Sequence, residues 1–128
     1  MSAAYVDTSY IVAVALGERR GAALARRLVA YDVLLAANLL EAELRSVLAR
    51  ENVSADPGEL LDRISWILPD RPLSGECARV LAAGYLRGAD LWHLACALFV
   101  EPEPHALAFL TLDLAQEAVA RTLGFPVP

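Results

Sequence analysis

Three aspartates stand where an apolar run meets a helix, a position from which carboxylates can bind a ligand together. Asp7 follows the apolar residues 3–6, and Asp113 follows the apolar residues 106–110. Asp90 begins an apolar helical segment after a glycine-containing turn. In open α/β sheets, ligands bind outside the carboxyl ends of the strands, so carboxylates from distant sequence positions can meet there. Each aspartate alone is better explained as a helix N-cap, but two at strand ends favour convergence.

A fourth carboxylate, Glu43, lies in a helix expected over residues 38–50. Leu39 and Val47, four residues before and after it, are apolar, so Glu43 lies along the inward stripe of that helix. Glu41 lies further from the stripe. A carboxylate on an inward face is unfavourable unless it is paired or binds a metal ion. Because Glu43 is near the edge of the stripe, a functional role and a simple amphipathic placement both stay open.

Short strands that alternate with helices must position these carboxylates. We expect strands at residues 3–6, 33–37 and 106–110, all of them near-continuous apolar runs. Such runs are typical of a parallel sheet that helices cover on both faces. The sequence therefore predicts an α/β fold: one three-layer domain over residues 1–128, with a mostly parallel central sheet flanked by helices. The expected helices are one after Ser9 through Leu16, a second after Gly17, 38–50 with Asn38 as N-cap, 56–66 with Asp56 as capping residue and Pro57 at the first helical position, one capped by Ser74 through Ala83, 90–100, and 114–123 closed by Gly124.

The composition is that of a globular protein that needs no disulfides. With 57% hydrophobic and 21% charged residues, the chain of 128 residues can bury a core and is not disordered. The longest apolar runs fall far short of the roughly 20 residues that cross a bilayer, and no signal-peptide pattern is present. Cys77 and Cys96 lie in apolar helical contexts and are expected to be buried thiols. These features predict a cytoplasmic protein without a membrane partner.

The charge excludes some functions and leaves nucleic-acid binding open. All 11 basic residues are arginine, and the absence of lysine excludes a P-loop NTPase and a Schiff-base enzyme. The net charge of −5 is unusual for a protein that binds nucleic acid, because phosphate affinity normally comes from basic side chains. A bound divalent cation would reverse the local sign at a carboxylate cluster.

Four segments, taken in order, carry the candidate carboxylates: residues 5–9 (Tyr-Val-Asp-Thr-Ser), 42–48 (beginning Ala-Glu-Leu), 88–95 (with Asp90-x-x-His93-Leu-Ala) and 109–113 (ending Thr-x-Asp). These segments resemble the acidic motifs of PIN-domain ribonucleases, in particular the VapC-type toxins of VapBC toxin–antitoxin pairs. Each motif alone is weak evidence, but four in the right order span nearly the whole chain.

The resemblance implies that Asp7, Glu43, Asp90 and Asp113 form one acidic pocket that binds Mg²⁺ or Mn²⁺. It further implies a metal-dependent endoribonuclease, a hydrolase of RNA phosphodiester bonds. Hard divalent cations suit this chemistry because they take oxygen ligands and keep bound water. Our hypothesis is that Asp7 and Asp90 are the principal metal ligands. Glu43 and Asp113 would complete the pocket, directly or through water, and one of them could orient the attacking water.

Several other polar residues lie close to these motifs. His93, one turn after Asp90, could hydrogen-bond that carboxylate but is better explained as a packed residue. Arg45 and Arg87 flank the motifs and could contact RNA phosphates, although solvated arginines are the better explanation. The hydroxyls that could either hold the carboxylates in place or cap helices belong to Thr8, Ser9 and Thr111.

The first two helices carry much apolar surface, which is either core or an interface. An exposed surplus would mark an interface, and the resemblance implies a homodimer bound by a cognate antitoxin protein. In the second helix we expect the arginines 19, 20, 26 and 27 to face water. The apolar residues in question are Tyr10, Ile11, Val12, Val14 and Leu16, with Ala23, Leu24, Leu28 and Val29 of the second helix expected inside.

Two other acidic-pocket enzymes do not fit, and one alternative remains. A response-regulator receiver domain needs a late lysine and an early acidic pair, both absent here. A haloacid-dehalogenase-type phosphatase needs Asp-x-Asp, whereas Ser9 stands two residues after Asp7. The remaining alternative is a catalytically silent PIN-fold binding or scaffold module. The four filled acidic positions disfavour it.

Overall fold

Four short parallel strands form the centre of the molecule. The computed structural model describes residues 2–128, and within them the strands are β1 (Ala3–Val6), β2 (Val33–Ala37), β3 (Ile64–Ile67) and β4 (Ala108–Leu110). The strand order is β3-β2-β1-β4, and all three pairings are parallel. Tyr5 of β1 aligns with Leu35 on one side and with Phe109 on the other. The central strand β1 therefore ends beside β4, at the edge where Asp7 follows.

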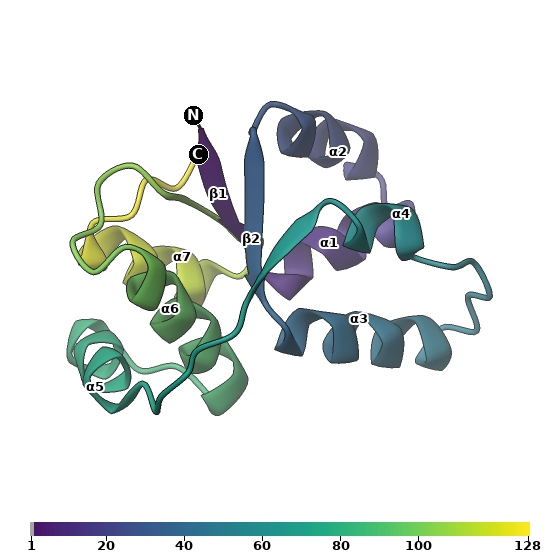
Figure 1. Ribbon diagram of the computed structural model, residues 1–128. Coiled ribbons are helices and arrows are strands. Elements are labelled where there is room, and N and C mark those ends of the chain that lie inside the picture. The colour runs from purple at the N-terminus through teal and green to yellow at the C-terminus, as the bar shows by residue number, and fades with distance from the viewer. Residues whose placement is uncertain (1) are drawn as a thin grey trace.

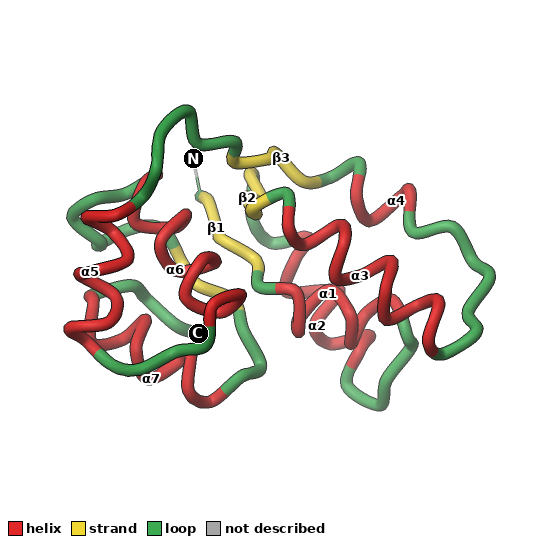
Figure 2. Tube along the Cα trace, turned by 90° about the horizontal axis from the view of Figure 1, so that it is seen from below, coloured by secondary structure: helices red, strands yellow, loops and turns green. Residues whose placement is uncertain are grey.

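The helices cover both faces of this sheet, as the sequence predicted. Figures 1 and 2 show α1 to α4 on one side and α5 to α7 on the other. Ala4 and Val6 of β1 belong to the core beneath α1 to α4, whereas Tyr5 belongs to the core beneath α5 to α7. The three-layer α/β fold is confirmed. The helices are α1 (Thr8–Ala15), α2 (Gly21–Val29), α3 (Leu39–Arg50), α4 (Gly58–Leu61), α5 (Ser74–Ala83), α6 (Gly88–Val100) and α7 (Leu114–Leu123).

The expected helix over residues 56–66 is wrong in its second half. The helix there, α4, ends at Leu61, and the chain continues as the edge strand β3. Ile64 and Ile67 are buried and align with Leu34 and Ala37 of β2. Isoleucine and tryptophan fit a half-buried strand well, and pairing with β2 outweighs the helical pattern that precedes them. The strand β4 also begins two residues later than expected, at Ala108.

One expected helix cap and two expected core residues are also wrong. Asn38 is the N-cap of α3 as expected, although its side chain makes no capping hydrogen bond, whereas Ser74 is itself the first residue of α5. In α2, Leu24 and Leu28 are buried, but Ala23 is exposed and Val29 is 70% exposed. The buried face of α2 is therefore narrow, with one large apolar side chain per turn, and the rest of the helix surface faces solvent.

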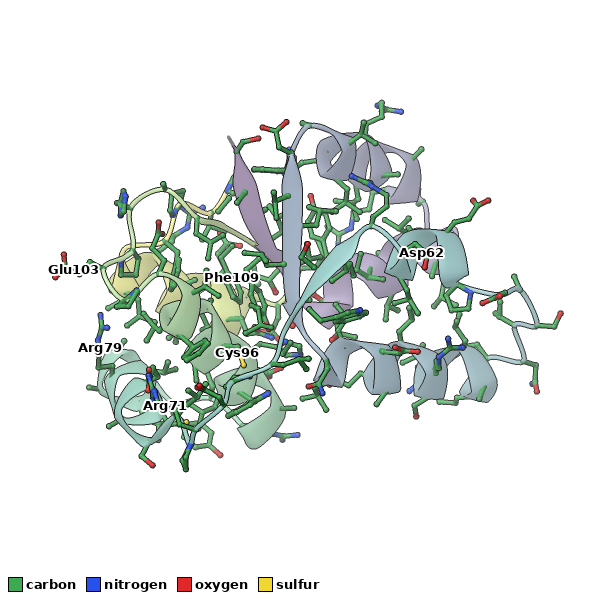
Figure 3. The ribbon with its side chains drawn as sticks, viewed as in Figure 1. Asp62, Arg71, Arg79, Cys96, Glu103 and Phe109 are labelled. Carbon is green, nitrogen blue, oxygen red and sulfur yellow. The ribbon has the colours of Figure 1, made fainter. Side chains whose placement is uncertain are left out.

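Most of the apolar surface of α1 lies in the core. Tyr10 and Ile11 are almost fully buried, and Val12, Val14 and Leu16 are partly buried against the same cluster. On the other side of the sheet, Phe109 stacks on Tyr5 with ring centroids 5.2 Å apart, and Cys96 lies inside α6 (Figure 3). Burial raises the pKa of the Cys96 thiol to about 12, while Cys77 is only half-buried. No helix among residues 2–128 is long and apolar enough to cross a membrane.

Candidate metal and active site

Asp7 lies at the carboxyl end of β1 with one side-chain oxygen firmly held. It is 3% exposed, caps α1, and its Oδ2 accepts hydrogen bonds from Ser9 Oγ at 2.7 Å and from Thr111 Oγ1 at 3.0 Å. The register of β1 with β4 pairs Val6 with Leu110, so the residues after these two strands lie side by side. No hydrogen bond from a described residue reaches Oδ1. Ser9 and Thr111 therefore fix the carboxylate and leave one oxygen for a ligand.

Asp113 joins this arrangement through the same hydroxyls. Thr111 Oγ1 accepts from Asp113 N at 3.0 Å, and Ser9 Oγ accepts from Leu112 N at 3.0 Å. Asp113 caps α7, its Oδ1 accepting from Gln116 N at 2.9 Å. Of the two roles open to Ser9 and Thr111, support of a carboxylate is the observed one, because the helix caps are Asp7, which accepts from Ser9 N at 3.3 Å, and Asp113.

Asp90 lies in the first turn of α6 rather than at its cap, because the helix begins at Gly88. Its Oδ1 accepts from Gln116 Nε2 at 2.9 Å. Gln116 of α7 therefore contacts both carboxylates, Asp90 through its side chain and Asp113 through its backbone N–H. Gln116 is 1% exposed, and sequence reasoning missed it. A signal existed: Gln at the third helical position after a capping residue is the pattern of a capping box. Asp90 and Asp113 line one pocket.

Glu43 is held by a buried chain of hydrogen bonds. Its Oε1 accepts from Thr8 Oγ1 at 2.8 Å and lies 2.8 Å from His93 Nε2. On the other side of the imidazole, Nδ1 lies 2.6 Å from the hydroxyl of Tyr5, which accepts from Ala37 N at 3.2 Å. Every group is satisfied if the Tyr5 hydroxyl donates to Nδ1 and Nε2–H donates to Glu43.

His93 is packed, as preferred from the sequence. It is 1% exposed, its close carboxylate contact is Glu43, and its Nε2 lies 3.8 Å from Asp7 Oδ1. The less favoured option, a hydrogen bond to Asp90, is not made. The packed role is correct, but the imidazole also ties α6 to α3.

The carboxylates influence one another electrostatically. Burial raises the pKa of Asp90, and the negative charges of Asp7 and Asp113 raise it further. The hydrogen bond from His93, with a further one from Thr8, lowers the pKa of Glu43. Glu43 is thus already stabilised as an anion, whereas Asp90 carries unrelieved repulsion that a cation would remove.

The donor set suits a hard divalent cation, although the side chains do not form a closed metal cage. Among the described residues, no three His, Cys, Asp or Glu side chains lie close enough together to hold a metal ion as they stand. Mg²⁺ needs only one or two carboxylates, because it keeps several waters. Asp7, Asp90 and Asp113 each have one oxygen held by the protein and one that accepts no hydrogen bond from residues 2–128. The residues therefore fit such an ion.

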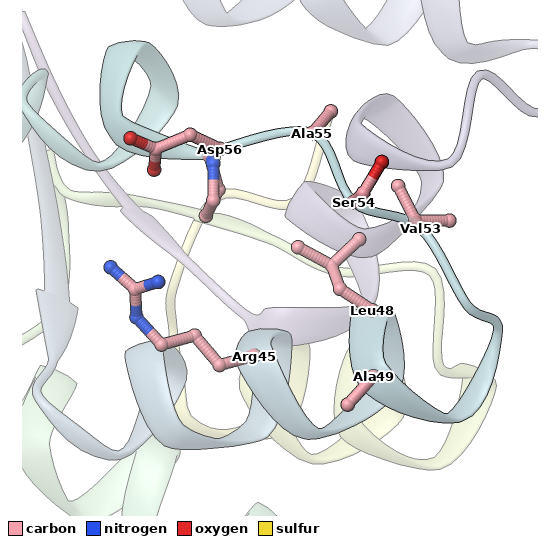
Figure 4. Close-up of a pocket in the computed structure, with 8 residues that line it drawn as sticks. Arg45, Leu48, Ala49, Val53, Ser54, Ala55 and Asp56 are labelled. Carbon is pink, nitrogen blue, oxygen red and sulfur yellow. The ribbon is translucent and has the colours of Figure 1, made fainter.

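A separate pocket lies between the C-terminal half of α3 and the loop that leads to α4 (Figure 4). Its lining includes Arg45, Leu48 and Asp56, and none of the four candidate carboxylates is among its lining residues. Arg45 is paired with Glu41 of its own helix at 2.7 Å. This arginine consequently belongs to the α3 pocket rather than to the acidic site.

Comparison with known families identifies the class of protein. Residues 4–122 match the family model of the PIN domain, so the chain belongs to the PIN domain family. The PIN domain is generally a nuclease fold, and its members typically depend on divalent metal ions. A comparison with curated proteins found no match.

Proposed function

We propose that the protein is a Mg²⁺- or Mn²⁺-dependent endoribonuclease. The observation that carries the proposal is the arrangement of Asp7, Asp90 and Asp113, each held through one oxygen by the protein, in a chain of the PIN domain family. Phosphodiester hydrolysis needs a positioned water and relief of charge on the phosphoryl oxygens. A divalent ion, when bound, supplies that charge relief and lowers the pKa of a bound water.

The protein side chains have distinct roles in this proposal. Asp7 and Asp90 are the principal metal ligands, and Asp113 completes the pocket directly or through water. Glu43, kept anionic by His93 and Thr8, orients the attacking water through the oxygen that accepts no hydrogen bond from residues 2–128. Because these supports are already formed, little reorganisation is needed when substrate binds.

The test is cleavage of single-stranded and structured RNAs in Mn²⁺ or Mg²⁺, with EDTA and an Asp7→Asn variant alongside. Asp62→Asn is the matched control, since Asp62 is exposed and lies near α4 (Figure 3). We expect cleavage by the parent and by Asp62→Asn, and none with EDTA or Asp7→Asn. Failure of Mn²⁺ to raise the melting temperature would contradict the metal site.

We further propose that the enzyme acts in the cytoplasm as the toxin of a type II toxin–antitoxin pair, as a homodimer with a cognate antitoxin protein. The sequence motifs support this finer assignment. An adjacent small gene for a DNA-binding protein that abolishes the ribonuclease activity would support it. Metal binding without cleavage of any RNA would instead favour the catalytically silent scaffold.

A further inference from the structure

The extended segment over residues 84–87, between α5 and α6, presents two side chains to solvent beside the acidic pocket. Leu86 is 4% exposed and packs into the core, whereas Tyr85 is 81% exposed and Arg87 is exposed. The backbone of Gly84 and of Arg87 is extended. Alternate residues of an extended chain point to opposite sides, so Tyr85 and Arg87 share the outer side while Leu86 anchors the segment.

A close contact fixes this segment against α7. A Cβ on Gly84 would lie 2.8 Å from Val119 Cγ2, so only glycine allows the chain to pass at this distance. The helix α7 begins directly after its cap, Asp113. The segment is therefore positioned relative to the acidic site, and Tyr85, Leu86, Arg87, Asp90, Asp113 and Ala115 line one pocket.

Arg87 has a guanidinium free to bind an anion. It forms no ion pair with any of residues 2–128, although two carboxylates line the same pocket. The nearby arginines of the α5 side are engaged: Arg71 pairs with Glu76 at 2.6 Å, and Arg79 donates to the carbonyl oxygen of Pro102 at 2.7 Å (Figure 3).

We propose that Tyr85 and Arg87 form a nucleotide-binding subsite next to the carboxylates. The Tyr85 ring stacks on an unpaired base, and Arg87 binds the neighbouring backbone phosphate. The ring is nearly free of protein contacts, and a base presents an open face to it only when it is splayed out of a helix. The subsite therefore selects RNA with an unpaired nucleotide beside the cleaved bond. The inference rests on the proposed function in one respect: it takes the bound nucleic acid to be RNA.

The pairing of an aromatic ring with a guanidinium favours a nucleotide over a protein partner here. A peptide that covered this pocket would need one acidic side chain for Arg87 and basic ones for the two carboxylates, because a buried charge without a partner is unfavourable. A nucleotide matches both groups at once, since its base offers a π-face and its phosphate offers bidentate acceptors. Exposed Leu114, next to Asp113, adds apolar surface that either partner could use.

Binding measurements in a Glu43→Gln background, which keeps the proposed metal ligands Asp7 and Asp90 but lacks the carboxylate proposed to orient the attacking water, test the subsite without cleavage of the probe. Fluorescence anisotropy in Mg²⁺ would compare a labelled single-stranded oligoribonucleotide with a blunt duplex of the same sequence. We expect an added Tyr85→Ala to weaken single-strand binding about 5- to 100-fold, Tyr85→Phe to keep it, and duplex binding to be unaffected by either. Arg87→Ala should weaken single-strand binding, whereas Arg26→Ala, an exposed arginine of α2, should not.

Three results of the binding measurements would overturn the subsite: no binding of the single strand by the parent, equal binding by Tyr85→Ala, or full binding by Tyr85→Leu. The leucine result would mean that apolar area rather than stacking matters, as at a protein contact. Cleavage assays separate this inference from the proposed function. If single-strand binding depends on Tyr85 but the unmodified protein cleaves no RNA, the ribonuclease proposal is contradicted and the subsite proposal is supported. If Tyr85→Ala cleaves RNA with an unchanged KM, the ribonuclease proposal is supported and the subsite proposal is contradicted.

Discussion

At the scale of single residues, the protein contains two buried tyrosine hydroxyls with opposite surroundings. The hydroxyl of Tyr5 links Ala37 N to His93 and, through the imidazole, to Glu43. The hydroxyl of Tyr10 is buried and makes no hydrogen bond of good geometry with residues 2–128, although the Arg27 guanidinium is near enough to lower the pKa of this phenol against the larger effect of burial. Burial raises the pKa of both phenols. A hydroxyl whose partners would be left unsatisfied is costly to remove, whereas one without partners is not.

Comparison of Tyr5→Phe with Tyr10→Phe measures the strength of this network. We expect Tyr5→Phe to lower the free energy of unfolding by about 1–3 kcal/mol, because Ala37 N–H and the His93 ring lose their partner. Tyr10→Phe should change it by less than about 0.5 kcal/mol. Urea unfolding of both variants gives the two values. If both variants lose the same free energy of unfolding, the hydrogen bonds of the Tyr5 hydroxyl do not contribute to stability.

At the scale of elements, close packing of α5 and α7 sets the path of the chain into the acidic pocket. Gly84 ends α5, and its lack of a side chain admits Val119 of α7. Gly75, inside α5, has no atom within 4 Å of its missing Cβ. Two glycines of one helix thus stand in very different surroundings.

Alanine at these two glycines should have opposite effects. We expect Gly84→Ala to destabilise by about 1–3 kcal/mol, because the added methyl group clashes with Val119. Gly75→Ala should stabilise by about 0.5–1 kcal/mol, because alanine is the better helix former. Thermal unfolding checks both. If the clash is the cause, Val119→Ala should cost less in the Gly84→Ala background than alone. If the free-energy changes of the two substitutions simply add, the clash is not the cause of the destabilisation.

One carboxylate, that of Glu101, binds three backbone N–H groups of the loop before β4. Glu101 Oε2 accepts from the backbone N–H groups of Leu107 at 2.8 Å, His105 at 3.2 Å and Ala106 at 3.3 Å. Partial burial alone would raise the pKa of Glu101, but these three donors outweigh it and hold the pKa below 4.5. The loop leads directly into β4 and so helps to place Thr111 and Asp113.

This carboxylate should make stability depend on pH in a defined direction. Since the folded-state pKa is lowered, the stabilisation is present above the unfolded value and is lost as pH falls through the folded value. We expect Glu101→Gln to cost about 1 kcal/mol at pH 7 and the difference from the parent to shrink below pH 4.5. Urea unfolding across this range gives the result. Glu103→Gln, exposed in the same loop, should show neither effect.

The elements differ in how far the sequence could predict them. The strands β1 and β2 were predicted with their observed bounds, because each is an apolar run buried on both faces. The helix α7 was predicted because Asp113 caps it and Gly124 ends it with φ of 106°. The edge strand β3 continues a helical pattern, and only its pairing with β2 reveals it. The bond between Tyr5 and His93 joins residues 88 positions apart, and no local pattern encodes it.

At the scale of the whole molecule, charge works against the proposed substrate. The net charge is −5, and most arginines that are close to the core or to α5 are engaged in local hydrogen bonds. Arg19, Arg20 and Arg26 lie on or before α2, exposed and away from the acidic motifs. Near the proposed active site, Arg87 is the cation without an ion-pair partner among the described residues. A divalent ion therefore has to supply most of the attraction for phosphate.

The salt dependence of RNA binding follows from this distribution. For a single strand, each neutralised phosphate contributes about −0.7 to the slope of log affinity against log salt, so one or two contacts predict only about a 3- to 7-fold loss between about 50 and 200 mM KCl. Chelating the divalent ion should weaken binding far more, because the acidic pocket then repels the strand. Anisotropy titrations of a Glu43→Gln variant, which keeps the proposed metal ligands Asp7 and Asp90, measure both under these conditions. A loss approaching a thousandfold would require many phosphate contacts, and would place the strand on the arginines of α2 instead of beside Tyr85 and Arg87.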